Sequence, residues 1–196
     1  MIKVSFKQLS KSASKIDRQK EQSYLLSYRE FISYFSGLET IERNNFIIAT
    51  HFVYGWMPTI LHLGSISEEI TLEALYPHLL EALNKVKNDI EISDTDLNLL
   101  IRVVNNSLVG VSKLLHFVNP KSYAIWDSRV YKYIYGKRPH NYQICDTEKY
   151  KCYLDNCLEI SNHVKFLDFH NDINEKIGYE VSAFRAIEWV MYMDVS

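Results

Sequence analysis

The chain has 196 residues, of which 47% are hydrophobic, and it carries a formal net charge of −2. An apolar fraction of this size excludes a disordered chain, and the length fits one domain or one domain of two tightly packed helical lobes. No apolar run approaches the roughly 20 residues that a membrane span needs, and the basic N-terminus lacks the apolar segment of a secretory signal. We therefore expect a cytoplasmic protein with no membrane partner.

The elements predicted along the chain are almost all helices, because glycines and prolines are few and apolar residues recur at helical spacing. Only residues 1–6 have the character of an isolated short strand. Pro77 is expected to kink or split one helix, and Ser93 with Asp96 forms a capping-box pattern that opens another. In chain order, the predicted helices cover 17–36, 39–54, a short stretch through Ile60 and Leu61, a helix from near Ser67 or Thr71 to 87, then 93–104, 111–118, 126–135, a helix capped by Asp146 or Thr147 that ends at 161, and 180–193. The sequence thus predicts an all-α fold in a single domain, 1–196.

Positive charge is concentrated in two blocks of an otherwise acidic chain. Residues 1–20 carry six bases against the single acid Asp17, and residues 102–138 carry seven bases against Asp127. Such blocks favour a polyanion-binding face, with chance clustering on solvated helix faces as the alternative. Residues 1–20 are interpreted as either an ordered element or a basic arm. The three cysteines form no CxxC pair and no zinc-finger spacing, so we expect reduced thiols and no metal site.

The segment 105–136 has the pattern of a helix end, a tight turn and a second helix. We place the turn at 108–111 and expect its backbone N–H groups to bind a phosphate, because a helix N-terminus leaves such groups without partners and carries partial positive charge. Gly110 would permit a close approach of the backbone and a positive φ. Lys113 adds a cation in the first turn of the second helix. The predicted phosphate-binding backbone comprises Val109, Gly110, Val111 and Ser112.

Asp127 is the lone acid of the central basic block and stands at the start of the predicted helix 126–135. Capping that helix is the ordinary role of an aspartate at such a position. Its neighbours favour a chemical role as well. Trp126 supplies an apolar wall, and Ser128 and Arg129 supply groups that bind phosphate and keep the carboxylate ionised.

These two motifs resemble the helix-hairpin-helix DNA glycosylases. LVGVSK (108–113) is similar to the hairpin pattern Leu-x-Gly-Val-Gly-x-Lys of that family, and AIWDSRV (124–130) is similar to its later Pro-Val-Asp-x-His-Val or Pro-Ile-Leu-Asp-x-x-Val segment, which holds the catalytic aspartate. Within the family, the chain resembles the small bacterial 8-oxoguanine-glycosylase-like proteins. In these, Ser-Lys-x-Leu-His-Phe precedes Pro-x-x-x-x-Ile-Trp-Asp-Ser-Arg-Val. We place the hairpin motif at about 97–136.

The resemblance implies two helical lobes around a cleft, duplex DNA as the partner and an N-glycosylase that flips out the nucleotide it attacks. Asp127 would stabilise the oxocarbenium-like sugar and orient the attacking water. Lys113 stands where the lyase branch has the lysine that attacks C1′. The chain departs from the family in replacing the second hairpin glycine, by Val111 or Ser112, and in a segment between Lys113 and Asp127 that is about one helical turn shorter. Lys113 is therefore interpreted as a nucleophile, a phosphate contact or a surface lysine.

The base pocket of such an enzyme contains aromatic side chains that stack on the flipped base and polar groups that read its edge. The candidates here are Tyr54, Trp56, His116 and Trp126, with Phe117 beside them. A buried, hydrogen-bonded core histidine is an equal alternative for His116, and Trp189 and Tyr192 are assigned to the core. The substrates considered are a damaged base, as in DNA repair, and a hypermodified phage base such as glucosylated cytosine, as in anti-phage defence.

Two other classes of function stay open. One is a non-catalytic helix-hairpin-helix module that binds distorted DNA, and the other is a helical protein–protein adaptor with incidental basic blocks. We expect a monomer, and no cofactor apart from a monovalent cation at the hairpin.

Overall fold

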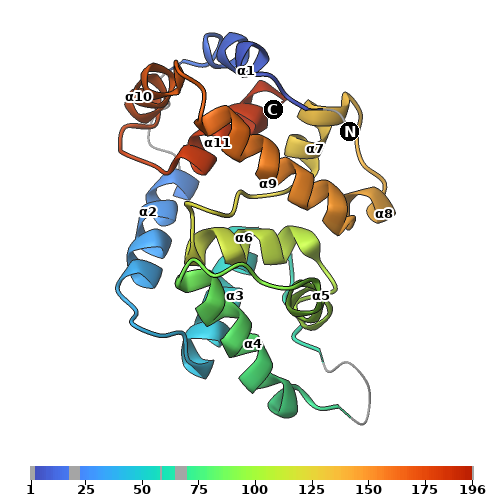
Figure 1. Ribbon diagram of the computed structural model, residues 1–196. Coiled ribbons are helices and arrows are strands. Elements are labelled where there is room, and N and C mark those ends of the chain that lie inside the picture. The colour runs from blue at the N-terminus through green and yellow to red at the C-terminus, as the bar shows by residue number, and fades with distance from the viewer. Residues whose placement is uncertain (1–2, 18–22, 58, 65–69, 196) are drawn as a thin grey trace. The chain divides into compact units, whose positions relative to one another are not determined.

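The computed structural model describes residues 3–17, 23–57, 59–64 and 70–195. Within these residues the chain forms eleven helices (Figure 1), and the β-structure there is one isolated antiparallel bridge between Leu63 and Val104. The all-α prediction is confirmed. None of the helices described is long and apolar enough to cross a membrane.

The chain divides into two compact units. Unit 1 comprises Met1–Leu26 with Pro120–Ser196, and unit 2 comprises Ser27–Asn119. The chain passes from unit 1 to unit 2 within helix α2 (Ser23–Ser36). The other helices of unit 2 are α3 (Arg43–Trp56), α4 (Leu72–Lys87), α5 (Asp94–Val103) and α6 (Leu108–Val118). The other helices of unit 1 are α1 (Phe6–Ala13), α7 (Ser128–Tyr135), α8 (Asn141–Ile144), α9 (Thr147–Ser161), α10 (Phe166–Ile177) and α11 (Ala183–Asp194).

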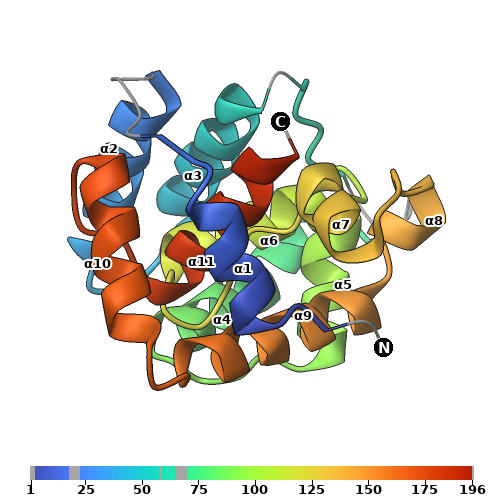
Figure 2. The same ribbon diagram turned by 90° about the horizontal axis from the view of Figure 1, so that it is seen from above.

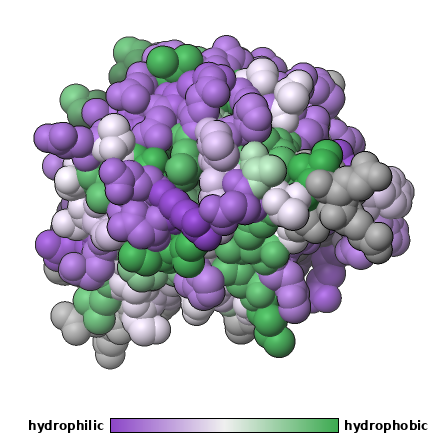
Figure 3. Space-filling model, turned by 90° about the horizontal axis from the view of Figure 1, so that it is seen from below, coloured by the Kyte–Doolittle hydropathy of each residue, from purple (hydrophilic) through white to green (hydrophobic). Residues whose placement is uncertain are grey.

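Helix α6 is the central helix of unit 2, where α3, α4 and α5 each pack against it. Its sequence, LVGVSKLLHFV, is apolar on nearly every side, which is the pattern of a helix with no solvent face. All of its residues except Val109 are buried. The exposed large apolar side chains of unit 2, Ile48, Ile60, Ile70 and Ile90, come from different segments, and on the face seen in Figure 3 apolar residues lie among hydrophilic ones.

Local signals fix two helix starts of unit 2. Thr71 caps α4, and Pro77 lies inside α4 without splitting it. Ser93 and Asp96 form the predicted capping box at the start of α5, and Lys85 pairs with Asp96 at 3.3 Å. Burial of Asp96 raises its pKa, but the hydrogen bonds from Ser93 and the charge of Lys85 together lower the pKa below its ordinary value.

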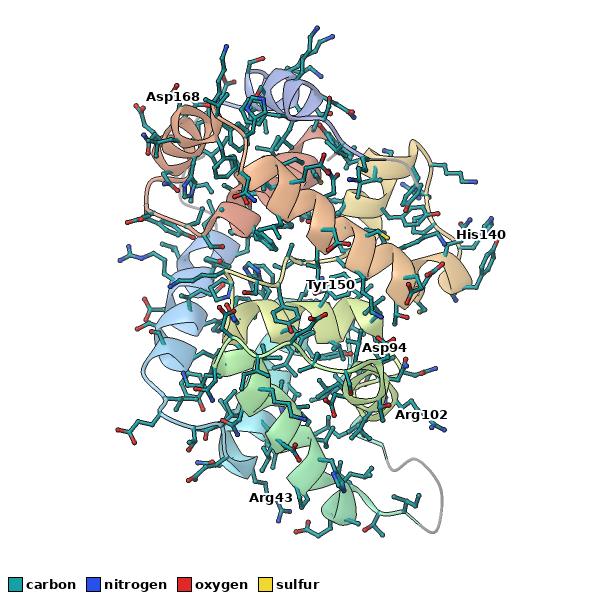
Figure 4. All side chains as sticks on the ribbon, viewed as in Figure 1. Arg43, Asp94, Arg102, His140, Tyr150 and Asp168 are labelled. Carbon is teal, nitrogen blue, oxygen red and sulfur yellow. The ribbon has the colours of Figure 1, made fainter. Side chains whose placement is uncertain are left out.

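Helix α11 is the central helix of unit 1, and α1, α7, α9 and α10 pack around it (Figures 1 and 2). Trp189 of α11 is fully buried. Helix α1 is joined to α9 by the Asn156 amide, which accepts from the backbone N–H of Val4 at 2.8 Å and donates to its carbonyl at 3.1 Å. Tyr150 of α9, labelled in Figure 4, donates its hydroxyl to the carbonyl of Ala124 at 3.2 Å.

Several predicted elements were wrong. Residues 3–5 form no strand, because Ser5 caps α1 and Leu9 and Ala13 bury one side of that helix; residues 1–2 lie outside the described part. Residues 59–64 are not helical. Helix α3 begins at Arg43 instead of 39, because Glu42 and Asn45 cap its start reciprocally. Helices α8 and α10 were not anticipated. The predicted start of α2 at 17 falls partly on residues 18–22, outside the described residues.

Candidate functional site

Helices α5 and α6 are joined by a turn at 104–107, so the expected turn at 108–111 is wrong. Asn105 and Asn106 both adopt the left-handed conformation, with φ of 57° and 50°. Asparagine tolerates this region better than most residues because its short polar side chain forms local hydrogen bonds. Residues 108–111 form the first turn of α6, which Ser107 caps.

The segment 60–64 holds this turn in place. The backbone N–H of Asn105 donates to the carbonyl of His62 at 3.1 Å, and the Asn105 amide donates to the carbonyl of Ile60 at 2.9 Å. Its oxygen accepts from the backbone N–H of His62. Gly64 adds a backbone bond to Val103 at 3.0 Å. The turn at 104–107 is therefore held on one side by hydrogen bonds to the segment 60–64.

The amides predicted to bind phosphate are mostly occupied. The Gly110 N–H donates to Ser107 Oγ at 3.1 Å, and the Val111 N–H donates to the Ser107 carbonyl at 3.0 Å. Ser112 is buried inside α6, and its hydroxyl donates to the Val109 carbonyl at 2.9 Å. Gly110, Val111 and Ser112 are thus excluded as backbone donors to phosphate. In the described part of the chain, the amides without a partner at this turn are those of Asn106, Leu108 and Val109.

Gly110 has a packing role that the sequence did not indicate. A Cβ placed on Gly110 would lie 2.4 Å from Tyr54 Oη and 2.9 Å from Tyr54 Cζ. The Tyr54 side chain of α3 therefore fills the space beside Gly110 where a phosphate was expected. The φ of Gly110 is not positive, contrary to expectation; among the described glycines, Gly136 and Gly178 have positive φ. Burial raises the pKa of Tyr54, and the Ser107 hydroxyl acts in the opposite direction.

The base-pocket candidates fall into two separate aromatic clusters. In unit 2, His116 is fully buried and lies 2.9 Å from the Tyr28 hydroxyl through Nε2, and Trp56 and Phe117 pack edge to face with their centroids 5.3 Å apart. In unit 1, Trp126 is fully buried and donates its indole N–H to the Ile144 carbonyl at 2.9 Å. His116 therefore has the hydrogen bond and burial of a core histidine.

Lys113 lies on α6 with 6% of its surface exposed. An ordinary surface lysine is therefore ruled out. A buried ammonium is costly unless polar groups compensate it. Lys113 belongs to unit 2 and Asp127 to unit 1.

Asp127 is the N-cap of α7, and its carboxylate is half-buried. Oδ1 accepts from the backbone N–H of Arg129 at 2.9 Å and of Val130 at 3.0 Å. Oδ2 has no hydrogen bond to any residue that the structure describes. The capping role is thus met by one oxygen, and Ser128 and Arg129 are exposed directly after Asp127.

Sequence reasoning missed Tyr192 of α11, which was assigned to the core. It is half-buried, and the Arg129 guanidinium lies over its ring, 4.3 Å from the centroid. Burial raises the pKa of Tyr192, and the Arg129 charge lowers it while the Asp127 charge raises it. Asp127, Arg129 and Tyr192 therefore form one electrostatic group. The signal was present: Arg185, Glu188 and Tyr192 form a polar line beside the apolar stripe of α11.

Neither the cysteines nor the other ligating side chains form a metal centre in the residues that are described. Cys145 is exposed, Cys152 is half-buried and Cys157 is buried, and all three are free thiols. No group of three His, Cys, Asp or Glu side chains suited to a metal was found there.

No protein-family model matches the chain, and searches of curated proteins and of solved structures found no match. The function is therefore argued from the two motifs and their geometry.

Proposed function

We propose that this protein is a DNA N-glycosylase in which the α5–α6 hairpin binds the DNA backbone and Asp127 acts on the sugar of a flipped nucleotide. The observation that carries the proposal is the half-buried Asp127 carboxylate, which caps α7 with one oxygen and keeps the other free beside exposed Ser128 and Arg129. The hairpin supports it through the partnerless amides of Asn106 and Val109.

In the proposed reaction, the bond between C1′ and the base nitrogen breaks, the departing base takes up a proton from solvent, and water adds to C1′ to give an abasic site while its proton passes through Asp127 to solvent. Positive charge develops on the sugar during this step, and the ionised Asp127 stabilises it and accepts the proton of the water. Arg129 neutralises a neighbouring phosphate. The two helical lobes around a cleft remain part of this proposal, as does Lys113 as the nucleophile of a lyase step.

Duplex oligonucleotides that carry a panel of modified bases test the proposal, with mass spectrometry for the released base. Glucosylated phage DNA belongs in the panel: it should be nicked after alkali while unmodified plasmid stays intact. Asp127→Asn should lower base release by about 100-fold or more, because a group of this type contributes that much to such reactions. Asparagine is an equally good N-cap, so folding should be preserved.

Asp146→Asn is the matched control, because Asp146 caps α9 through a bond from the Lys149 N–H at 3.1 Å and has no proposed chemical role. Equal base release by wild type and Asp127→Asn would exclude the proposal. Borohydride trapping of a protein–DNA adduct, and its loss in Lys113→Gln, tests the lyase step separately.

The capping bonds of Asp127 also favour a second candidate, a helix-hairpin-helix module that binds distorted DNA without chemistry. Such a module releases no base from any member of the panel. It still binds duplex DNA, and the affinity of Asp127→Asn is then equal to or higher than that of wild type, because a negative charge near phosphate has been removed.

A further inference from the structure

The structure joins the two basic blocks of the sequence in one place. Helix α1 comes from the first block and α7 from the second, and both pack on α11 within unit 1. Ser12 of α1 and Tyr133 of α7 are hydrogen-bonded through their hydroxyls at 2.9 Å. Figure 2 looks down on α1 with α7 beside it. An open depression of about 360 Å³ lies between them, lined on its basic side by Lys11, Lys15 and Lys132.

The lysines of α1 and its flanks form a regular row. Lys7 and Lys11 lie in α1, Lys3 precedes it and Lys15 follows it, each four residues from the next, and no acid occurs between residues 3 and 16. Lys7, Lys11 and Lys15 are exposed, whereas Leu9, Ala13 and Ile16 are buried. Like charges at this spacing destabilise an isolated helix by about 0.2–0.5 kcal/mol per pair. The Lys7–Lys11 pair within α1 is therefore unfavourable for the helix by itself.

Two of these four lysines have an acidic partner. Lys3 pairs with Glu159 and Lys15 with Asp194. Within the described residues, neither a hydrogen bond nor an ion pair is made by the side chains of Lys7, Lys11, Lys132, Lys137 and Arg138. The last three belong to α7 and the residues just after it, next to Gly136, which also lines the depression. Lys11 and Lys132, which line the depression, are thus cations without an acidic partner among the described residues.

The depression itself is not an anion pocket. Helices α1, α7 and α11 all end beside it; their C-termini carry partial negative charge, and the Asp194 carboxylate adds a full negative charge. Charge is therefore nearly balanced in the depression, and the excess lies on the long side chains at the rim. Such a rim fits an extended polyanion that makes several weak contacts.

We propose that this rim, made of Lys7, Lys11 and Lys132 and here called the α1–α7 rim, is a second contact surface for the phosphate backbone of duplex DNA. The inference rests on the proposed function for its partner. Residues four apart on a helix are separated by roughly 6 Å along its axis, which is near two nucleotide rises of about 3.4 Å in one DNA strand. The exposed residues of α1 are lysine and glutamine, without the aromatic or leucine side chains that insert into a membrane surface.

The test is fluorescence anisotropy with a labelled 30-base-pair duplex between 50 and 300 mM KCl. The binding constant K falls as salt rises, so a plot of log K against log salt has a negative slope. Each lost phosphate contact makes that slope shallower by about 0.9. The slope should therefore become shallower by about 1.8 in Lys7→Gln/Lys11→Gln and by about 2.7 in the triple variant that adds Lys132→Gln. The matched control is Lys151→Gln/Lys165→Gln, which removes two charges from α9 and the start of α10 and should leave the slope unchanged.

Equal slopes for the rim variants and wild type, or no binding of wild type to the duplex at 50 mM KCl, would overturn the inference. Glutamine favours helix, so circular dichroism should show unchanged helicity for all variants. A shallower slope in the rim variants of a protein that releases no base would refute the glycosylase and still support the α1–α7 rim as a DNA contact. Base release by wild type with an unchanged slope in the rim variants would refute the rim alone.

Discussion

Replacing Gly110 by alanine measures how tightly α3 packs on α6. The new Cβ would lie 2.4 Å from Tyr54 Oη, 2.9 Å from Cζ and 3.1 Å from Cε2. Tyr54 is only 4% exposed, so its ring has no open side into which it could move. Overpacking of this kind costs about 1–3 kcal/mol, whereas alanine in place of a helical glycine gains about 1 kcal/mol. We expect a net destabilisation of about 1 kcal/mol.

Urea denaturation followed by circular dichroism gives the free energies of unfolding. Gly55→Ala is the matched control, because Gly55 lies in the neighbouring α3 with nothing within 4 Å of the added Cβ. That variant should be stabilised by about 0.5–1 kcal/mol. In a Tyr54→Phe background the nearest atom is gone, and Gly110→Ala should lose part of its cost. Equal stabilisation by Gly110→Ala and Gly55→Ala would refute the packing role of Gly110.

Three further predictions concern capping, pH and thiol chemistry. Asp127→Ala should lower the free energy of unfolding by about 1 kcal/mol while Asp127→Asn lowers it little, as urea titration would show; equal losses would contradict the capping role. Because the pKa of Asp96 is lowered in the folded state, its stabilising contribution is full above pH 3.8 and is lost as pH falls below that value. Asp96→Asn should therefore flatten this acid-induced loss of stability, and an unchanged acid titration would be the contrary result. Burial raises the pKa of the Cys157 thiol, so a disulfide reagent should modify exposed Cys145 in the native protein and Cys157 only after unfolding. Native modification of Cys157 would show that its site opens.

The parts of the fold that were predicted from the sequence depend on short-range signals. The start of α5 at the Ser93–Asp96 capping box is one case, and the start of α9 after Asp146 is another. In both, the side chain that caps the helix is within three residues of the amide it accepts from. Such contacts depend only on neighbouring residues, so these helix starts can be predicted from the sequence.

The misplaced hairpin turn shows where this reading fails. Gly110 was interpreted as the turn residue, but Asn105 and Asn106 supply the left-handed backbone and the glycine is needed for Tyr54. Tyr54 is far away in sequence, so only the packed structure shows why a side chain is excluded at Gly110. The same reason explains Tyr192, whose contact with Arg129 joins two helices that no local pattern connects.

For the candidate site, the sequence located Asp127 at a helix start but could not show how its two oxygens are used. Capping was treated as the alternative to a chemical role. The structure has both capping bonds on Oδ1, so the two roles are compatible in one carboxylate. The base-pocket candidates were less well predicted, because aromatic side chains at helical spacing are equally suited to a core.

The discontinuity of unit 1 has a consequence for the order in which the protein assembles during synthesis. Unit 2 is one continuous stretch, so all of its helices have emerged from the ribosome once Asn119 has. Helix α1 precedes unit 2 in the chain, whereas α11, which packs on it, and Asn156, which bonds Val4 just before it, follow unit 2. Closure of such long-range contacts is slow. The apolar side of α1, including Leu9, therefore stays exposed until α11 has been synthesised. We expect a nascent-chain chaperone to bind this segment.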